Sequence, residues 1–335
     1  MRTDAFLYEL PEKLIAQQPI EPRDHARLMV VDRKTEKIEH ALFKDLARWI
    51  QPSDLLVLNN SQVIPARLSA EKGSVEIFLL EETSPQHWLA IGKPGKKLRM
   101  GHRLWLDPIC PEIKPVQVEV LNTLPDGQRV IRFFEEIDLQ DFGSLPLPHY
   151  IEQARKRSHS KTHVSEDDAW YQTVYASEAG SVAAPTAGLH FTPELLSQFQ
   201  TAFVTLHVGL GTFRPVKVEN IEDHEMHTER YVIPKDLAEK AKQASRVVAV
   251  GTTTARVLES VPSLRPGPGR TNIFIHPPYT PKRVDALITN FHLPGSTLIM
   301  LVAGFMGLEL QKYAYEEAIK NDYKFYSYGD AMLIL

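Results

Sequence analysis

Apolar residues near both ends of the chain alternate between helical and extended spacing. In the first 61 residues this spacing predicts a helix over 9–19, a strand over Arg27–Val31, a helix over Phe43–Ile50 and a strand over Leu55–Leu58. The second half predicts strands and helices in turn, namely Phe203–Val208, Asp236–Ser245, Val247–Val250, Thr253–Ser260, Ala286–Thr289 and Ser296–Met306, with a short helix after Thr192. The apolar residues after Asp330 predict that the C-terminal tail docks as a strand. This alternation is typical of an α/β domain.

The pattern changes between residues 62 and 153, where short strands follow one another without a convincing helix. Turn residues separate five predicted strands, which are Val75–Leu80, Trp88–Ile91, Arg103–Leu106, Val116–Leu121 and Arg129–Phe133. Closely spaced strands of this kind predict a small β-barrel. We therefore expect a mixed α/β (α+β) chain in which a β-barrel domain, 62–153, is inserted into an α/β domain made of 1–61 and 154–335.

Composition narrows the class of protein. A chain of 335 residues suggests about two domains at the usual ~150 residues each. A single cysteine, Cys110, excludes an internal disulfide framework and a cysteine-rich metal site. The net charge of −4 argues against a protein that holds nucleic acid mainly by bulk charge, although local basic patches remain open to that role.

No segment predicts export or membrane anchoring. The longest apolar run, Leu298–Phe305, is far shorter than the ~20 residues that span a bilayer. The N-terminal residues are too polar for a secretory signal. A cytoplasmic protein without a membrane partner is therefore expected.

Two loops rich in small residues stand beside predicted strands and helices. VAAPTAGLHFT (182–192) contains Thr186, Gly188 and His190, and a ligand can approach such a backbone closely. HVGLGTFRPV (207–216) leaves a strand and presents His207, Gly209, Gly211 and Arg214, but it lacks the third glycine of a dinucleotide-binding loop. From pattern alone, a plain loop before a helix and a half-buried, satisfied histidine remain open as alternatives.

Three further segments carry polar groups suited to proton transfer or anion binding. HEMHTE (224–229) supplies His224, His227 and Glu229, and its spacing does not match a zinc-binding helix, so acid–base work is favoured over metal binding. VGTTTAR (250–256) leads into a predicted helix and supplies Thr252, Thr253 and Arg256. These residues suit the binding of a carboxylate at the helix N-terminus; alternatively, the threonines act only as helix caps. TNFHLPGS (289–296) adds Asn290 and His292 after another strand. If these strand ends lie together, their side chains form one cleft.

Basic residues concentrate in two places that suit a phosphate backbone. The first lies in the expected barrel and the second in the segment that returns from it; the candidate nucleic-acid-contacting residues are Lys93, Lys96, Lys97, Arg99, Arg103, Arg155 and Arg157. The insert itself is not basic overall, so a solvated turn is the simpler interpretation of the first cluster taken alone.

Taken together, the motifs resemble the S-adenosylmethionine:tRNA ribosyltransferase-isomerase family of queuosine biosynthesis. The matching stretches include LLVLNNSQVIPARL, VAAPTAGLHFT, HVGLGTFRPV, HEMHTERY, VGTTTARVLE, DALITNFHLPGSTLIMLVAGFMG and YSYGDAMLI, and they run from near residue 8 to the end. The resemblance implies that S-adenosylmethionine donates its ribosyl carbons to 7-aminomethyl-7-deazaguanine at the wobble position of tRNAs with a GUN anticodon. Epoxyqueuosine in tRNA, adenine and methionine would be the products, and no metal or cofactor would be needed besides the consumed S-adenosylmethionine.

That chemistry requires bases near neutral pH and donors for a carboxylate. The expected pool for proton transfer is His190, His207, His224, His227, Glu229 and His292, with Asp330 as a weaker candidate. The substrate-binding pool is Thr186, Gly188, Gly209, Gly211, Arg214, Thr252, Thr253, Arg256 and Asn290. The acting base stays open, and a monomer is expected.

Two other functions remain as alternatives. A methyltransferase would use the same co-substrate, but the chain lacks the glycine-rich loop after its first strand. A non-catalytic tRNA-binding protein would use the β-barrel and the basic clusters. The net charge and the absence of an interleaved basic and aromatic pattern argue against this alternative.

Overall fold

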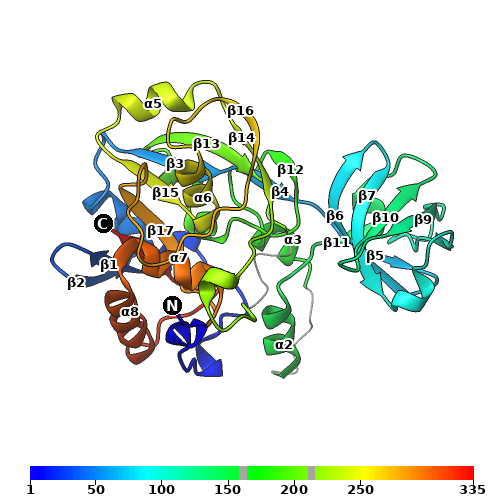
Figure 1. Cartoon of the computed structure of the whole chain (residues 1–335), viewed down its shortest axis with the longest axis horizontal. Coiled ribbons are helices and arrows are strands. Elements are labelled where there is room, and N and C mark those ends of the chain that lie inside the picture. The colour runs from blue at the N-terminus through cyan, green and yellow to red at the C-terminus, as the bar shows by residue number, and fades with distance from the viewer. Residues whose placement is uncertain (158–163, 210–215) are drawn as a thin grey trace. The chain divides into compact units, whose positions relative to one another are not determined.

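The computed structural model describes residues 1–157, 164–209 and 216–335 (Figure 1). The chain divides into two compact units. The larger unit comprises 1–61, 148–178 and 184–335, and the smaller comprises 62–147 and 179–183. The short strands β4 (Ser61–Val63) and β12 (Glu178–Ser181), which lie at the chain crossings, pair with each other. The expected boundary at 153/154 falls inside helix α2 (His149–Arg157), which belongs to the larger unit.

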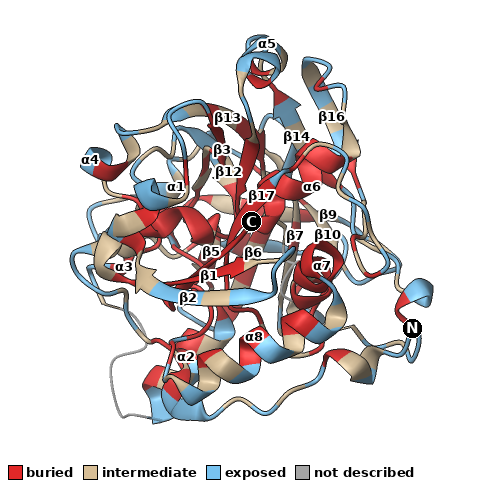
Figure 2. Cartoon of the chain, turned by 90° about the vertical axis from the view of Figure 1, so that its left-hand side faces the viewer, coloured by how far each residue is buried: buried red, intermediate tan, exposed pale blue. Residues whose placement is uncertain are grey.

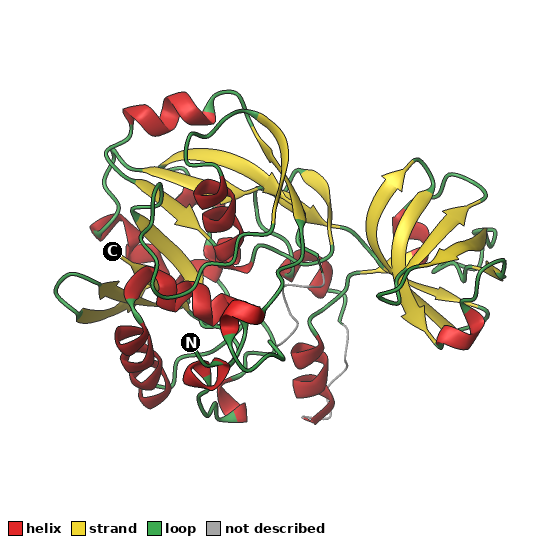
Figure 3. Ribbon diagram, viewed as in Figure 1, coloured by secondary structure: helices red, strands yellow, loops and turns green. Residues whose placement is uncertain are grey.

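A nine-stranded sheet forms the centre of the larger unit, in the order β16-β14-β13-β3-β15-β17-β18-β1-β2 (Figure 3). Its strands are β1 (Arg27–Asp32), β2 (Lys37–Leu42), β3 (Leu55–Asn59), β13 (Gln200–Leu206), β14 (Glu229–Ile233), β15 (Val247–Val250), β16 (Gly267–Thr271), β17 (Ala286–Asn290) and β18 (Ala331–Ile334). The central strands β13, β3, β15 and β17 run parallel to one another. Their carboxyl ends therefore meet at one edge, where α/β sheets commonly bind ligands.

The helices of the larger unit follow the expected signals in most places. They are α2, α3 (Asp167–Trp170), α4 (Pro193–Leu196), α5 (Leu237–Gln243), α6 (Thr252–Ser260), α7 (Thr297–Met306) and α8 (Leu308–Lys320). Thr192 and Ser296 accept hydrogen bonds from the backbone of the first turns of α4 and α7, as their positions before each helix predict. The strand expected at the C-terminal tail is confirmed as β18, which pairs with β1 and β17.

Apolar side chains of the central strands alternate between the two faces of the sheet. One face carries Leu56, Leu58, Val248, Val250 and Ile288, which cluster with residues of the 3-10 helices η4 (Phe43–Arg48) and η6 (Thr186–His190). Helix α6 contacts β3, β13, β15 and β17 and contributes nothing to that cluster, which places it on the opposite face. Figure 2 shows buried residues along the central strands and on α6 and α7. Burial on both faces explains why these strands read as continuous apolar runs.

Some sequence expectations were wrong in detail. Residues 9–19 contain only the 3-10 turn η2 (Glu12–Leu14), because Pro11 and Pro19 interrupt a continuous helix. Phe43–Arg48 is likewise a 3-10 helix and not an α-helix. The edge strands β2 and β16 and the neighbouring strand β14 were not predicted, because their polar and partly exposed residues give weak periodic signals. Helices α2, α3 and α8 were not predicted either.

The smaller unit is a seven-stranded antiparallel sheet in the order β11-β5-β6-β7-β10-β9-β8. Its elements are β5 (Arg67–Ala70), β6 (Val75–Ser84), β7 (His87–Lys93), β8 (Arg103–Trp105), β9 (Gln117–Thr123), β10 (Arg129–Phe133), β11 (Gly143–Ser144) and helix α1 (Leu139–Phe142). Backbone hydrogen bonds from Asp107 to Ser69 (2.9 Å) and from Glu71 to Trp105 (2.9 Å) curl the sheet toward a barrel. The expected class, α/β with a small antiparallel β unit, is confirmed.

Among the described residues, no helix is long and apolar enough to cross a membrane. In the same residues, no group of three or more histidine, cysteine, aspartate or glutamate side chains is placed to hold a metal ion.

Candidate functional site

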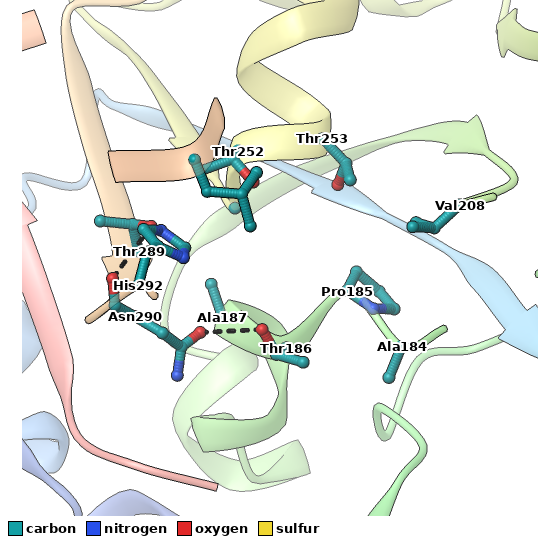
Figure 4. A pocket seen from close by; sticks show the side chains of 12 residues that line it. Ala184, Pro185, Thr186, Ala187, Val208, Thr252, Thr253, Thr289, Asn290 and His292 are labelled. Carbon is teal, nitrogen blue, oxygen red and sulfur yellow. Dashed lines mark hydrogen bonds between the residues drawn. The ribbon is translucent and has the colours of Figure 1, made fainter. Parts of the chain in front are cut away.

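A small pocket of about 40 Å³ lies at the carboxyl ends of the parallel strands in the larger unit (Figure 4). It is lined by Ala184, Pro185, Thr186, Ala187, Val208, Gly251, Thr252, Thr253, Thr289, Asn290, His292 and Leu298. These residues come from the loop before η6, the end of β13, the start of α6, the end of β17 and the start of α7. The structure therefore brings four of the five motifs together, as expected if the strand ends share one cleft.

Asn290 is the centre of a buried hydrogen-bond network below this pocket. Its side-chain amide donates to His190 Nε2 (3.1 Å) and to the Tyr326 carbonyl (3.2 Å), and its oxygen accepts from the Thr186 hydroxyl (3.1 Å). Burial, with a smaller contribution from the positive charge of Arg23, lowers the pKa of His190 to about 4. His190 is therefore neutral at pH 7, and Nε2 serves as an acceptor.

His292 is held on three sides. Its Nε2 lies 2.7 Å from the Thr289 hydroxyl, its backbone N–H donates to the Tyr315 hydroxyl (3.0 Å), and its carbonyl accepts from the Tyr8 hydroxyl. Burial lowers its pKa to about 3. His292 is thus a neutral, fixed hydrogen-bonding group at the wall of the pocket.

Helix α6 points its first turn into the pocket. Gly251, with a φ of 91°, turns the chain from β15 into the helix, and as the N-cap residue it has no side chain that could cap the first turn. The Thr253 hydroxyl accepts from Asn59 (3.3 Å), while that of Thr254 donates to the Val250 carbonyl (2.8 Å). The helix start therefore offers backbone N–H groups and partial positive charge to an anion.

His207 stands at the edge of the same site. It follows β13 directly before the pocket residue Val208, it is half-buried, and its Nδ1 lies 2.8 Å from the Ser61 hydroxyl. Gly209 follows, and a Cβ there would meet no atom of the described residues within 4 Å. Gly211 and Arg214, which the motif also proposed, lie outside the described residues.

The fifth motif, at residues 224–229, does not line the pocket. Glu229 and Arg256 form an ion pair that is almost fully buried. Half-buried His224 packs edge-on against Phe274 with ring centroids 5.4 Å apart, and burial, followed by the nearby His227, lowers its pKa. His227 is exposed. These residues belong to or border β14, two strands from β3, so the structure separates them from the pocket.

Asp330 and Gly188 have structural explanations. Both carboxylate oxygens of Asp330 accept backbone N–H groups, from Arg27 (2.8 Å) and Lys324 (2.6 Å), and burial raises its pKa. A Cβ on Gly188 would lie 1.8 Å from the Tyr175 hydroxyl. Glycine is therefore needed because another part of the protein approaches there, whereas the sequence had suggested approach of a ligand.

The basic candidates differ in accessibility. Lys93, Lys96, Arg99 and Arg103 are exposed, although Lys93 pairs with Glu76 (3.3 Å) and Arg103 with Glu119 (3.4 Å); Lys97 donates to Ser74 (2.7 Å). Exposed Arg157 pairs with Glu12.

Arg155 does not fit a role in phosphate binding. It is 4% exposed, binds both oxygens of Asp167 (2.7 and 2.8 Å) and also donates to the Gln17 carbonyl. Its guanidinium is not open to a phosphate, which corrects that expectation. The sequence did not indicate this burial, because Lys156 and Arg157, which follow Arg155, are also basic.

Three residues of the site were missed by sequence reasoning. Asn59 ends β3 and holds the Leu206 backbone at both N–H (3.0 Å) and carbonyl (2.9 Å). Its position, a polar residue closing an apolar strand, matches that of Asn290 and would have identified it. Tyr8 and Tyr315 bind His292 from far away in the sequence, and no local signal marks them.

Comparison with known proteins shows the family of the chain. The family model for queuosine biosynthesis protein matches residues 3–334. Relatives named S-adenosylmethionine:tRNA ribosyltransferase-isomerase are 49% identical in Thermotoga maritima and 47% identical in Desulfitobacterium hafniense, with full coverage of each chain. The crystal structure of S-adenosylmethionine tRNA ribosyltransferase from Thermotoga maritima matches 99% of this chain and 100% of its own, with a TM-score of 0.54 and 39% identity. The chain belongs to the S-adenosylmethionine:tRNA ribosyltransferase-isomerase family of queuosine biosynthesis proteins.

Proposed function

We propose that this chain transfers and isomerises the ribosyl part of S-adenosylmethionine onto 7-aminomethyl-7-deazaguanine in tRNA, giving epoxyqueuosine, adenine and methionine. The observation that supports this most is the convergence of four family motifs on one pocket at the strand ends. Because tRNA is the acceptor, we propose that the reaction takes place in the cytoplasm. We also propose that a monomer carries it out.

The start of α6 is the proposed site for the methionine carboxylate. Thr252 and Thr253 line the pocket from the first turn of a nine-residue helix whose N-terminal N–H groups have no side-chain cap. A carboxylate there gains from the helix dipole by about 0.3–1 kcal/mol, and more where water is excluded. Arg256 stays in the proposed substrate-binding pool, because Glu229 pairs only with its Nη1, and its Nε and Nη2 are buried without a hydrogen-bond partner among the described residues.

His190 and His292 are proposed to orient substrate and not to take its proton. Their pKa values, about 4 and about 3, make both imidazoles weak bases at neutral pH, and general bases work best with a pKa near the working pH. Neutral imidazoles and the Thr186, Thr289 and Asn290 side chains instead supply fixed hydrogen bonds.

Half-buried His207 is the first proton acceptor to test, because it adjoins pocket residue Val208 and Ser61 orients its ring. His224, His227 and Glu229 remain in the proposed pool only if the substrate reaches beyond β13. The tRNA backbone is proposed to contact Lys93, Lys96, Lys97, Arg99 and Arg103 of the smaller unit and Arg157 of the larger.

One experiment tests the reaction. Purified protein is incubated with S-adenosylmethionine and tRNA that carries the aminomethyl base, and the products are separated by chromatography and identified by mass spectrometry. Adenine and methionine released in equal amounts with epoxyqueuosine in the tRNA is the expected result. S-adenosylhomocysteine in their place would show methyl transfer, and tRNA binding without turnover would favour a non-catalytic protein. His207→Gln, which should lower kcat with S-adenosylmethionine binding retained, then tests the proposed base.

A further inference from the structure

The outward face of β8, β9 and β10 in the smaller unit carries an ordered set of arginines and aromatic rings. Arg103 and Trp105 on β8 pair in register with Glu119 and Gln117 on β9. On the other side of β9, Glu119 faces Arg132 of β10, and the Phe134 N–H donates to the Gln117 carbonyl (3.1 Å). Residues opposite one another in a ladder point to the same face. The same strands bury Leu104, Val118 and Phe133 on the other side.

Glu119 fixes both guanidinium groups of this set. Its two oxygens accept from Arg103 (3.4 Å) and Arg132 (2.7 Å). The guanidinium carbons then lie 5.0 and 4.8 Å from the centre of the Phe134 ring. Two arginines against one carboxylate leave a net positive charge on a face that also carries two rings. This arrangement is not visible in the sequence, because 13 residues separate Glu119 from Arg132 and 29 separate Trp105 from Phe134.

Both rings remain open to solvent. Trp105 is 53% exposed and Phe134 is 38% exposed, although large apolar side chains lose most by contact with water. Several nucleic-acid-binding sheets hold unpaired nucleotides with this combination, in which aromatic rings stack on bases and basic side chains bind phosphate.

We propose that this face, made of Arg103, Trp105, Arg132 and Phe134, binds unpaired nucleotides of the tRNA by stacking. The proposal rests on the proposed function, since it identifies where the tRNA substrate is held. It adds Trp105, Phe134 and Arg132 to the basic residues considered above. None of the four lines the pocket, so they are expected to affect tRNA binding and not the chemical step.

The test measures the Kd of fluorescently labelled tRNA for the full chain and its variants by anisotropy. Trp105→Ala is expected to weaken binding roughly five- to 100-fold, and Trp105→Phe, which keeps a stacking ring, about threefold or less. The control Tyr313→Ala removes a ring that is also 53% exposed, on α8, and should leave Kd unchanged. Arg132→Gln should weaken binding and flatten its dependence on salt. Single-stranded RNA should compete better than duplex RNA.

Turnover separates this proposal from the reaction itself. For Trp105→Ala the KM for tRNA should rise while kcat at saturating tRNA stays as in the wild type. If the wild type binds tRNA and releases adenine but Trp105→Ala and Arg132→Gln bind equally well, the face is not a nucleotide site and the reaction still stands. A wild type that binds no tRNA would overturn both. Circular dichroism spectra and melting temperatures matching the wild type exclude unfolding as the cause of weaker binding.

Discussion

Two buried histidines, His292 in the pocket wall and His190 in the network below it, should make the protein's stability depend steeply on pH. His190 and His292 have pKa values of about 4 and about 3 in the folded chain, against 6.5 when exposed in the unfolded chain. Between these values the unfolded chain binds more protons than the folded one, so stability is complete above about pH 6.5 and falls as the pH is lowered.

The magnitude follows from the same values. At pH 5 the folded histidines are still mostly neutral, whereas their unfolded counterparts are almost fully charged. Each histidine then lowers the free energy of unfolding by about 1.4 kcal/mol for every pH unit below 6.5, or by about 2 kcal/mol at pH 5. The pair accounts for about 4 kcal/mol, which is a large part of the 5–15 kcal/mol typical of a folded protein.

Urea unfolding at pH 8 and pH 5 measures this effect. Protonation of carboxylates also lowers the protein's stability at low pH. That contribution is common to the wild type and to the variants His190→Asn and His292→Gln. The difference in free energy of unfolding between the two pH values should therefore be about 2 kcal/mol smaller in each single variant and about 4 kcal/mol smaller in the double variant. Thr192→Ala, which removes the α4 cap without removing a titratable group, is the control and should keep the wild-type difference. Equal pH dependence in all these proteins would refute the assignment of both imidazoles as buried and neutral.

Three further changes test the packing and the network around the site. Gly188→Ala should lower the free energy of unfolding by about 1–3 kcal/mol or more in urea, because its Cβ would overlap the Tyr175 hydroxyl. Gly209→Ala, whose Cβ would meet no atom of the described residues within 4 Å, should leave this free energy unchanged. Arg155→Ala should lower the free energy of unfolding by about 3–5 kcal/mol, because it leaves Asp167 buried and unpaired. Arg157→Ala on the same helix should lower it by about 1 kcal/mol or less, and melting temperatures distinguish the two variants. Asn290→Ala loses three hydrogen bonds and should lower the free energy of unfolding by about 2–4 kcal/mol. The same variant should raise the KM for S-adenosylmethionine in the adenine-release assay. An unchanged KM would mean that the substrate binds elsewhere.

The parts of the fold that sequence predicted well are those whose cause is local. The buried strand Val247–Val250 is a continuous apolar run, and the buried strand Ala286–Asn290 begins with three apolar residues. Thr192 and Ser296 stand where a helix cap must stand. Edge strand β2 was missed because its residues, KIEHAL, are mostly polar or half-exposed. Its place is decided by pairing with β1, and periodicity does not carry that information.

The same division explains the candidate site. Polar residues at the ends of β15 and β17 converge because parallel strands end at one edge, so topology alone predicts that Thr252, Asn290 and His292 meet. Which of them can take a proton depends on burial, and burial is set by distant side chains. The Tyr8 hydroxyl, 284 residues away in the sequence, binds the carbonyl of His292, and burial lowers the pKa of this imidazole. A histidine motif therefore indicates a candidate site, whereas the tertiary surroundings decide whether the imidazole can act as a base or serves as a fixed, neutral hydrogen-bonding group.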